Sequence, residues 1–142
     1  MHYPTVTALR AKLAKAASLG LVALMALSLT SAANANSFTR GQHIEPAYEG
    51  WRPNEDGTFS FMFGYQNENW EEEPNVEIGP NNMFSPGEAD RGQPTHFLPR
   101  RNRFTFEVKV PADWGDRELV WTLKVNGVER KAYATLKQDY QV

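Results

Sequence analysis

The fold is decided by the stretch Leu119-Val120-Trp121-Thr122-Leu123-Lys124-Val125, which continues into Asn126-Gly127-Val128. Every second residue of this stretch is large and apolar, which is the two-residue period of a strand with one buried face. Asn126-Gly127 supplies the positive φ angles that a two-residue hairpin turn requires. A second alternating stretch then runs from Val128 to Leu136. We therefore predict a β-hairpin whose buried face is centred on Trp121.

The same two-residue period occurs in two earlier segments. It places one set of apolar residues on each inward face: Phe59, Phe61, Phe63 and Tyr65 in the first, and Phe104, Phe106, Val108 and Val110 in the second. Shorter candidate strands lie at Ile44–Gly50, Val76–Ile78 and Met83–Phe84. No segment after the first 35 residues carries a sustained 3.6-residue apolar repeat. The predicted fold is all-β, an immunoglobulin- or fibronectin-like β-sandwich of about seven strands.

The first 35 residues have the three parts of a secretory signal peptide. A cationic head precedes an apolar run from Ala16 to Leu29 and a small-x-small cleavage site at Ala33-Asn34-Ala35. The apolar run is shorter than the ~20 residues that cross a bilayer as a helix, which favours cleavage over a membrane anchor. We therefore predict a signal peptide over residues 1–35 and one domain over residues 36–142. The chain is expected to use the general secretory route, since no twin arginine is present, and to reach the periplasm or the cell exterior.

Removal of the leader changes the charge of the chain. It takes away Arg10, Lys12 and Lys15 but none of the 17 acidic residues, so the net charge falls from −2 to −5. An acidic surface argues against nucleic acid or anionic lipid as the partner, because both require a basic face. The sequence has no Cys, so the domain must be stabilised by its core alone. We expect a monomer that spans no membrane after cleavage.

A long segment from Gln66 to Asn102 has little strand pattern and is rich in proline. Segments of this length without regular structure are often functional. Its acidic part, Glu68–Glu73, lies near one end, and its basic part, Arg100–Arg103, extends from the other end into the next predicted strand. Two interpretations remain open. The charged parts either form a binding surface, or they neutralise one another across neighbouring strands.

The candidate binding surface consists of Trp70, His96, Arg100 and Arg101. Only polar residues flank Trp70, so nothing local draws its indole inward. An exposed indole can stack on the apolar face of a sugar ring. Two other tryptophans, Trp51 and Trp114, also fall near strand ends, but we expect their indoles to fold over the open ends of the sandwich.

No catalytic residue, metal ligand or cofactor site is predicted, and the protein is expected not to be an enzyme. After the leader, the histidines are His43 and His96, and no close-spaced set of zinc ligands occurs. Carboxylates and amides between Glu68 and Asp90 leave a calcium-stabilised loop open, although their spacing is not that of a calcium-binding loop. The serines lack a nucleophile-elbow context, and no glycine-rich phosphate loop is present.

One resemblance to a known family rests on the stretch Gly92-Gln93-Pro94-Thr95-His96-Phe97-Leu98-Pro99-Arg100-Arg101. With this motif, with Phe104-Thr105-Phe106-Glu107-Val108 and with the opening Gly50–Phe59, the chain resembles an uncharacterised family of exported bacterial proteins. The resemblance covers most of the chain after the leader. It implies an immunoglobulin-like β-sandwich with a long patterned loop, and it brings no activity with it.

The function expected from the sequence is that of an exported, non-catalytic β-sandwich module. Such a module would mediate protein–protein interaction in the cell envelope or outside the cell. Two alternatives remain open. The first is a carbohydrate-binding module that uses loop tryptophans, and the second is a small calcium-stabilised binding domain.

Overall fold

The computed structural model describes residues 38–142, so the predicted signal peptide lies outside the described residues. The described chain is all-β, as predicted, with one short 3-10 helix. Its elements in chain order are β1 (Ile44–Pro53), β2 (Phe59–Asn67), β3 (Asn82–Ser85), β4 (Arg100–Val110), β5 (Leu119–Val125), β6 (Val128–Ala134) and η1 (Gln138–Tyr140). Over residues 38–142, no helix has the length and apolarity needed to cross a bilayer.

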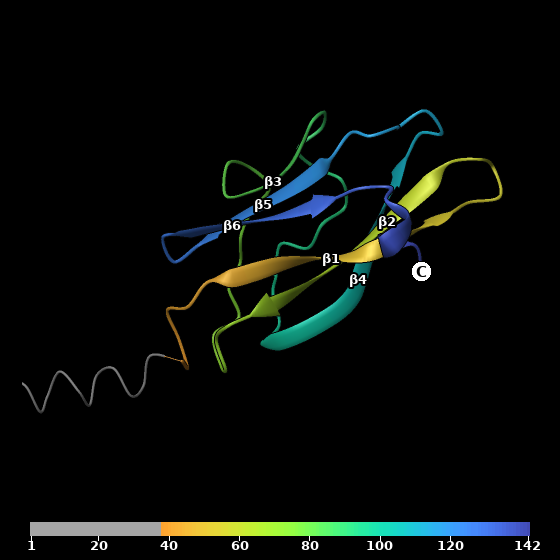
Figure 1. Cartoon of the computed structure of the whole chain (residues 1–142). Helices are drawn as coiled ribbons and strands as arrows, with labels where there is room; N and C mark the ends of the chain where they lie inside the picture. The colour runs from red at the N-terminus through yellow and green to blue at the C-terminus, as the bar shows by residue number, and fades with distance from the viewer. Residues whose placement is uncertain (1–37) are drawn as a thin grey trace, which may run out of the picture. The chain divides into compact units, whose positions relative to one another are not determined.

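The strands form two antiparallel sheets with the orders β1-β2-β4 and β3-β5-β6. Figure 1 shows β5 and β6 as one layer and β1, β2 and β4 as the other. The two layers are linked where β1 passes β6. There the Tyr48 hydroxyl donates a hydrogen bond to the backbone oxygen of Thr135, with 2.6 Å between the oxygens. Apolar residues of the two sheets meet between them, as in a sandwich: Phe63 of β2 packs against Phe84 of β3 and Trp121 of β5.

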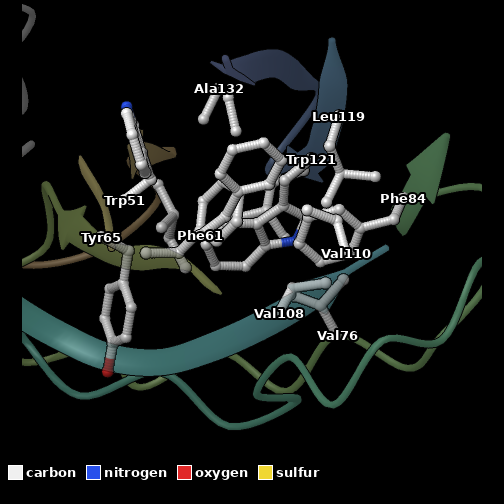
Figure 2. Close-up of a cluster of buried hydrophobic side chains, with 14 of the residues drawn as sticks. Trp51, Phe61, Tyr65, Val76, Phe84, Val108, Val110, Leu119, Trp121 and Ala132 are labelled. Carbon is white, nitrogen blue, oxygen red and sulfur yellow. The ribbon is translucent and has the colours of Figure 1, made fainter. Parts of the chain in front are cut away.

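Aromatic rings fill the space between the sheets, and Trp121 lies in the middle of them (Figure 2). The Trp121 ring stacks on Phe84 at 5.8 Å between centroids and meets the edge of Phe106 at 5.0 Å. Its indole N–H donates to Oδ1 of buried Asn82 at 2.9 Å. The amide nitrogen of Asn82 donates in turn to the backbone oxygens of Val76 and Pro94. The most buried polar groups of the core are thus hydrogen-bonded, as burial requires.

Most predicted strands are present, but Val76–Ile78 is not a strand. The Val76 amide donates to the Thr95 oxygen at 2.7 Å, and the Phe97 amide donates to the Pro74 oxygen at 3.1 Å. These bonds form a single bridge between two loop segments, too short for a strand. Met83 and Phe84, in contrast, lie in β3 as expected. The described residues therefore contain six strands rather than about seven.

The prediction that Phe104 shares the inward face of its strand is wrong. The pairing of β2 with β4 passes from Phe63↔Phe106 directly to Tyr65↔Asn102, so the Arg103–Thr105 segment bulges opposite Gly64. Phe104 adopts a φ of 48° within this bulge and is 54% exposed. Extra residues in one strand break the two-residue alternation, because the pleat no longer continues through them.

Candidate functional site

The tryptophan side chains divide into buried and exposed ones. Trp51, Trp114 and Trp121 are buried, with 8%, 3% and 0% exposure, whereas Trp70 is 59% exposed. The indole N–H of Trp51 donates to the Lys137 oxygen, and that of Trp114 donates to the Arg117 oxygen, both at 2.7 Å. The expectation that Trp51 and Trp114 fold inward is confirmed. Trp70 is therefore the exposed indole of the described chain.

Two buried amides at the end of β2 hold the backbone that carries Trp70. Asn67 donates from its side chain to the Glu72 oxygen at 2.8 Å, and its Oδ1 accepts from both nitrogens of Asn69. Asn69 also exchanges two hydrogen bonds with the backbone of Gln42. Since Asn67 and Asn69 take the inward positions of this turn, Trp70 between Asn69 and Glu71 is left at the surface.

Two groups contact the Trp70 indole on this surface. The Arg100 guanidinium carbon lies 5.5 Å from the centroid of the Trp70 ring, a cation–π arrangement. The Phe38 ring stacks on the same indole with centroids 6.3 Å apart, and the Trp70 amide donates to the Phe38 oxygen at 2.9 Å. Arg100 has a φ of 66° and pairs across the sheet with Asn67. The sheet register therefore brings the first residue of β4 to the loop that follows β2.

Beside these groups lies a shallow cavity of about 280 Å³, here called the Trp70 hollow. It is lined by Gln66, Asn67, Glu68, Trp70, Arg100 and Arg101. The hollow joins the end of β2 to the start of β4, and it brings three of the four predicted surface residues together. The fourth, His96, does not line it.

Arg101 and Arg100 have different environments although they are neighbours. Arg101 forms an ion pair with the largely buried carboxylate of Glu49 and donates to the backbone oxygens of Tyr65 and Asn102 at 3.2 Å. Arg100 has no ion pair and no side-chain hydrogen bond within residues 38–142. Arg101 is therefore committed to holding β4, whereas the guanidinium donors of Arg100 are open to solvent.

Tyr65 anchors the segment that leads into Arg100. Its hydroxyl accepts a hydrogen bond from the Leu98 amide at 2.9 Å, and burial raises the pKa of Tyr65 above its ordinary value. Its ring packs edge-on against buried Phe97 at 4.9 Å. The side chain of a β2 residue thereby fixes the entry into β4, and the position of Arg100 follows from it.

His96 has a separate role in the loops. Its Nδ1 lies 2.8 Å from Oδ1 of Asn75, and its Nε2 lies 3.0 Å from Oε1 of Glu73. Both contacts bind the loop before β3 to the loop before β4, next to the bridge between Asn75 and His96. In this structure His96 therefore links two loops and does not contribute to the Trp70 hollow.

The acidic and basic parts of the long segment do not neutralise one another. Over the described range, no ion pair joins Glu68–Glu73 to Arg100–Arg103. Arg101 instead reaches Glu49 on β1, and Glu73 reaches His96. Of the two interpretations drawn from the sequence, mutual neutralisation is therefore not observed.

Other features of the described chain offer less chemistry. A larger cavity, about 470 Å³, lies between the Pro74–Asn81 loop and Lys124–Asn126, and no aromatic side chain lines it. Among residues 38–142, no three His, Asp or Glu side chains converge as metal ligands would. The calcium alternative thus gains no support from the geometry.

Two contributors to the Trp70 surface are not evident from the sequence. Phe38 lies far from Trp70 along the chain, and no pattern in the sequence links the two. Glu49 lies on β1 and reaches Arg101 only because both strands flank β2. Neither pairing has a local signature, since each depends on the sheet register.

Comparison with models of protein families gave no match to this chain. Comparisons with curated proteins and with solved structures also gave no significant match. The function must therefore be argued from the Trp70 hollow itself.

Proposed function

We propose that the protein is an exported, non-catalytic β-sandwich module that binds another protein through the Trp70 hollow and its surroundings. The observation that carries the proposal is the 59% exposure of Trp70 beneath the Arg100 guanidinium. The other three indoles of the domain are buried, so the exposure of Trp70 sets it apart from them.

Trp and Arg are the residue types that most often dominate protein interfaces. A large aromatic side chain loses water-exposed apolar area when a partner covers it, a gross gain of about 25 cal/mol per Å² from which the costs of association are subtracted. The Arg100 guanidinium would fix the orientation of a bound partner, since its donors bind planar acceptors in a defined geometry. The rigid backbone around Asn67 and Asn69 reduces the ordering that binding would require.

Side-chain docking suits this surface better than strand addition. β4 is an outer strand of its sheet and is open to pairing in principle. However, the bulge at Arg103–Thr105 interrupts the strand, and Arg103 and Lys109 place charge on it. Bulges and charged side chains are the features that protect sheet edges from pairing. We therefore assign the contact to the loop after β2 and the start of β4.

The immunoglobulin-like type and the export route belong to the same proposal. The orders β1-β2-β4 and β3-β5-β6 correspond to the A-B-E and C-F-G strands of an immunoglobulin-like sandwich that lacks a D strand. This order supports that fold type. The leader at residues 1–35 supports export through the general secretory route, and with it a periplasmic or extracellular partner.

Carbohydrate binding is the second candidate. The amide side chain of Gln66 beside an exposed indole is a combination that sugar-binding sites use. Against it, Trp70 is the one exposed indole of residues 38–142, whereas a sugar site built on several loop tryptophans would need more than one. The protein–protein proposal therefore comes first.

The proposal is tested by capture from envelope extracts on immobilised protein beginning at Asn36. Trp70→Ala removes the central side chain, and Tyr133→Ala is the matched control, because Tyr133 is an exposed aromatic on the other sheet. We expect one partner to be retained by wild type and Tyr133→Ala and lost by Trp70→Ala. If no protein distinguishes Trp70→Ala from wild type, while soluble glycans shift the tryptophan emission, sugar binding replaces the proposal.

A further inference from the structure

We propose that the Trp70 hollow receives a single carboxylate side chain from the partner, together with an aromatic ring that lies beside it on the same face of the partner. This inference rests on the proposed function and specifies the chemistry of the segment that docks. It follows from the charge of the hollow and from the state of Arg100.

The charge of Arg100 is not paired with any acidic side chain among residues 38–142. Its guanidinium carries five N–H donors, and within residues 38–142 none of them bonds to a protein acceptor. The domain has an excess of acidic residues, and Glu68 lines the same hollow without pairing with Arg100. A cation left unpaired in an acidic domain is available to an acid from outside.

The backbone of Arg100 is held in an unfavourable conformation. A φ of 66° is unfavourable for a residue with a Cβ, and costs of this kind persist where the surrounding structure fixes them. Here the fixed elements are the Asn67 partner across the sheet and the Tyr65 hydroxyl bond to Leu98. The backbone of Arg100 is thus fixed at the edge of the hollow, and its guanidinium lies over the Trp70 ring with no ion pair within residues 38–142.

The guanidinium of Arg100 and the rings of Trp70 and Phe38 suit a carboxylate that has an aromatic ring beside it. A carboxylate accepts two parallel hydrogen bonds from a guanidinium, and such charge-assisted pairs are the strong ones. The Trp70 and Phe38 rings offer an apolar surface beside it for an aromatic ring. The cavity of about 280 Å³ has room for side chains, not for a folded element.

The lining of the hollow limits the number of negative groups that it can receive. Glu68 lines the wall of the hollow, and Arg101 is already neutralised by Glu49. A second negative group in the hollow would meet Glu68, since the cations that line it are Arg100 and the already paired Arg101. One carboxylate fits this arrangement, whereas a dense polyanion does not.

The test uses a short synthetic peptide with blocked ends and with a tyrosine and a glutamate two residues apart in its centre, so that an extended peptide carries both on one face, and the same peptide with glutamine in place of glutamate. Binding to the protein beginning at Asn36 is followed by the NMR resonance of the Trp70 indole N–H. We expect the glutamate peptide to bind about tenfold more tightly than the glutamine peptide at low ionic strength. Arg100→Gln should abolish that preference.

Arg103→Gln is the matched control, because Arg103 is an exposed arginine of β4 that does not line the hollow. It should keep the preference for glutamate. Equal binding of the two peptides, or an equal loss in Arg103→Gln, overturns the inference. Tighter binding of an oligogalacturonate than of the glutamate peptide also overturns it, because the carboxylate would then come from a glycan.

Failure of this inference is distinguishable from failure of the proposed function. If neither peptide binds but envelope capture still depends on Trp70, the interaction stands and the carboxylate assignment is wrong. If capture does not depend on Trp70, the interaction proposal itself is wrong.

Discussion

Trp121 and Trp70 are the same residue type in opposite situations. Trp121 lies within β5, has no exposed surface, and gives its indole N–H to a buried amide. Trp70 lies in the turn after β2, is mostly exposed, and is touched by Phe38 and Arg100. The position of each residue in the chain explains the difference. A tryptophan at an alternating strand position is carried into the core, whereas one between inward-facing asparagines stays outside.

The two regions also differ in what stabilises them. Around Trp121, stability comes from buried apolar area and from ring packing. Around Trp70, the backbone is held by hydrogen bonds of Asn67 and Asn69, and the indole adds little to them. Substitutions in the first region should therefore reduce stability, and substitutions in the second should reduce binding.

The largest expected effect is that of Trp121→Ala. Removing this ring leaves a cavity between Phe84 and Phe106 and should lower the free energy of unfolding by about 3–5 kcal/mol. Trp70→Ala should lower it by less than about 1 kcal/mol. Urea unfolding at neutral pH measures both. Similar losses for the two variants would mean that Trp70 is part of the core.

Next comes a pair of fully buried asparagines, one in each region. Asn82→Leu leaves the Trp121 indole N–H and two backbone oxygens without partners, at a cost of about 2–4 kcal/mol. Asn69→Leu breaks the bonds to Gln42 and should change the Trp70 emission spectrum with a smaller global loss. An unchanged Trp70 spectrum in Asn69→Leu would show that this amide does not position the indole.

Gly64→Ala tests how the bulge of β4 places the hollow. A Cβ at Gly64 would overlap the Asn102 oxygen and would come within 2.8 Å of Oε1 of Glu49. We expect a loss of about 1–3 kcal/mol and a displaced Arg101. Glu49→Gln, which weakens the ion pair without adding a clash, should cost less. If Gly64→Ala folds with unchanged stability, the close approach of β2 and β4 at the bulge is not as described.

Tyr48→Phe should lower the free energy of unfolding by about 1 kcal/mol at neutral pH, because the hydrogen bond to Thr135 is lost. Burial raises the pKa of Tyr48 above its ordinary value near 10. The unfolded chain therefore releases this proton at a lower pH than the folded chain does. Stability should fall as the pH rises above about 10, and less steeply in Tyr48→Phe. Chemical unfolding measured from pH 8 to 11 checks this, and identical slopes would contradict it.

Much of the fold could be predicted because apolar alternation and the Asn126-Gly127 turn are local signals. The β5-β6 hairpin and the inward faces of Phe61, Phe63 and Tyr65 follow from them. Phe104 could not be placed correctly, because the bulge that turns it outward depends on the pairing of β4 with β2.

The candidate site could be predicted in part for the same reason. The polar neighbours of Trp70, a local property, predict a surface position, and the structure places its indole at the surface. Arg100 and Arg101 look alike in the sequence, and only the contact with Glu49 separates their roles. Phe38 and His96 are placed by hydrogen bonds between distant loops, which sequence patterns do not reveal.

In the folded domain, one indole is exposed beside a guanidinium that has no ion pair or side-chain hydrogen bond among residues 38–142. Quenching of tryptophan emission in the protein beginning at Asn36 tests it most directly. We predict an accessible fraction that iodide quenches more strongly than caesium does, that disappears in Trp70→Phe, and that loses its iodide preference in Arg100→Gln. Emission that resists both quenchers, or an accessible fraction that persists in Trp70→Phe, would contradict the account.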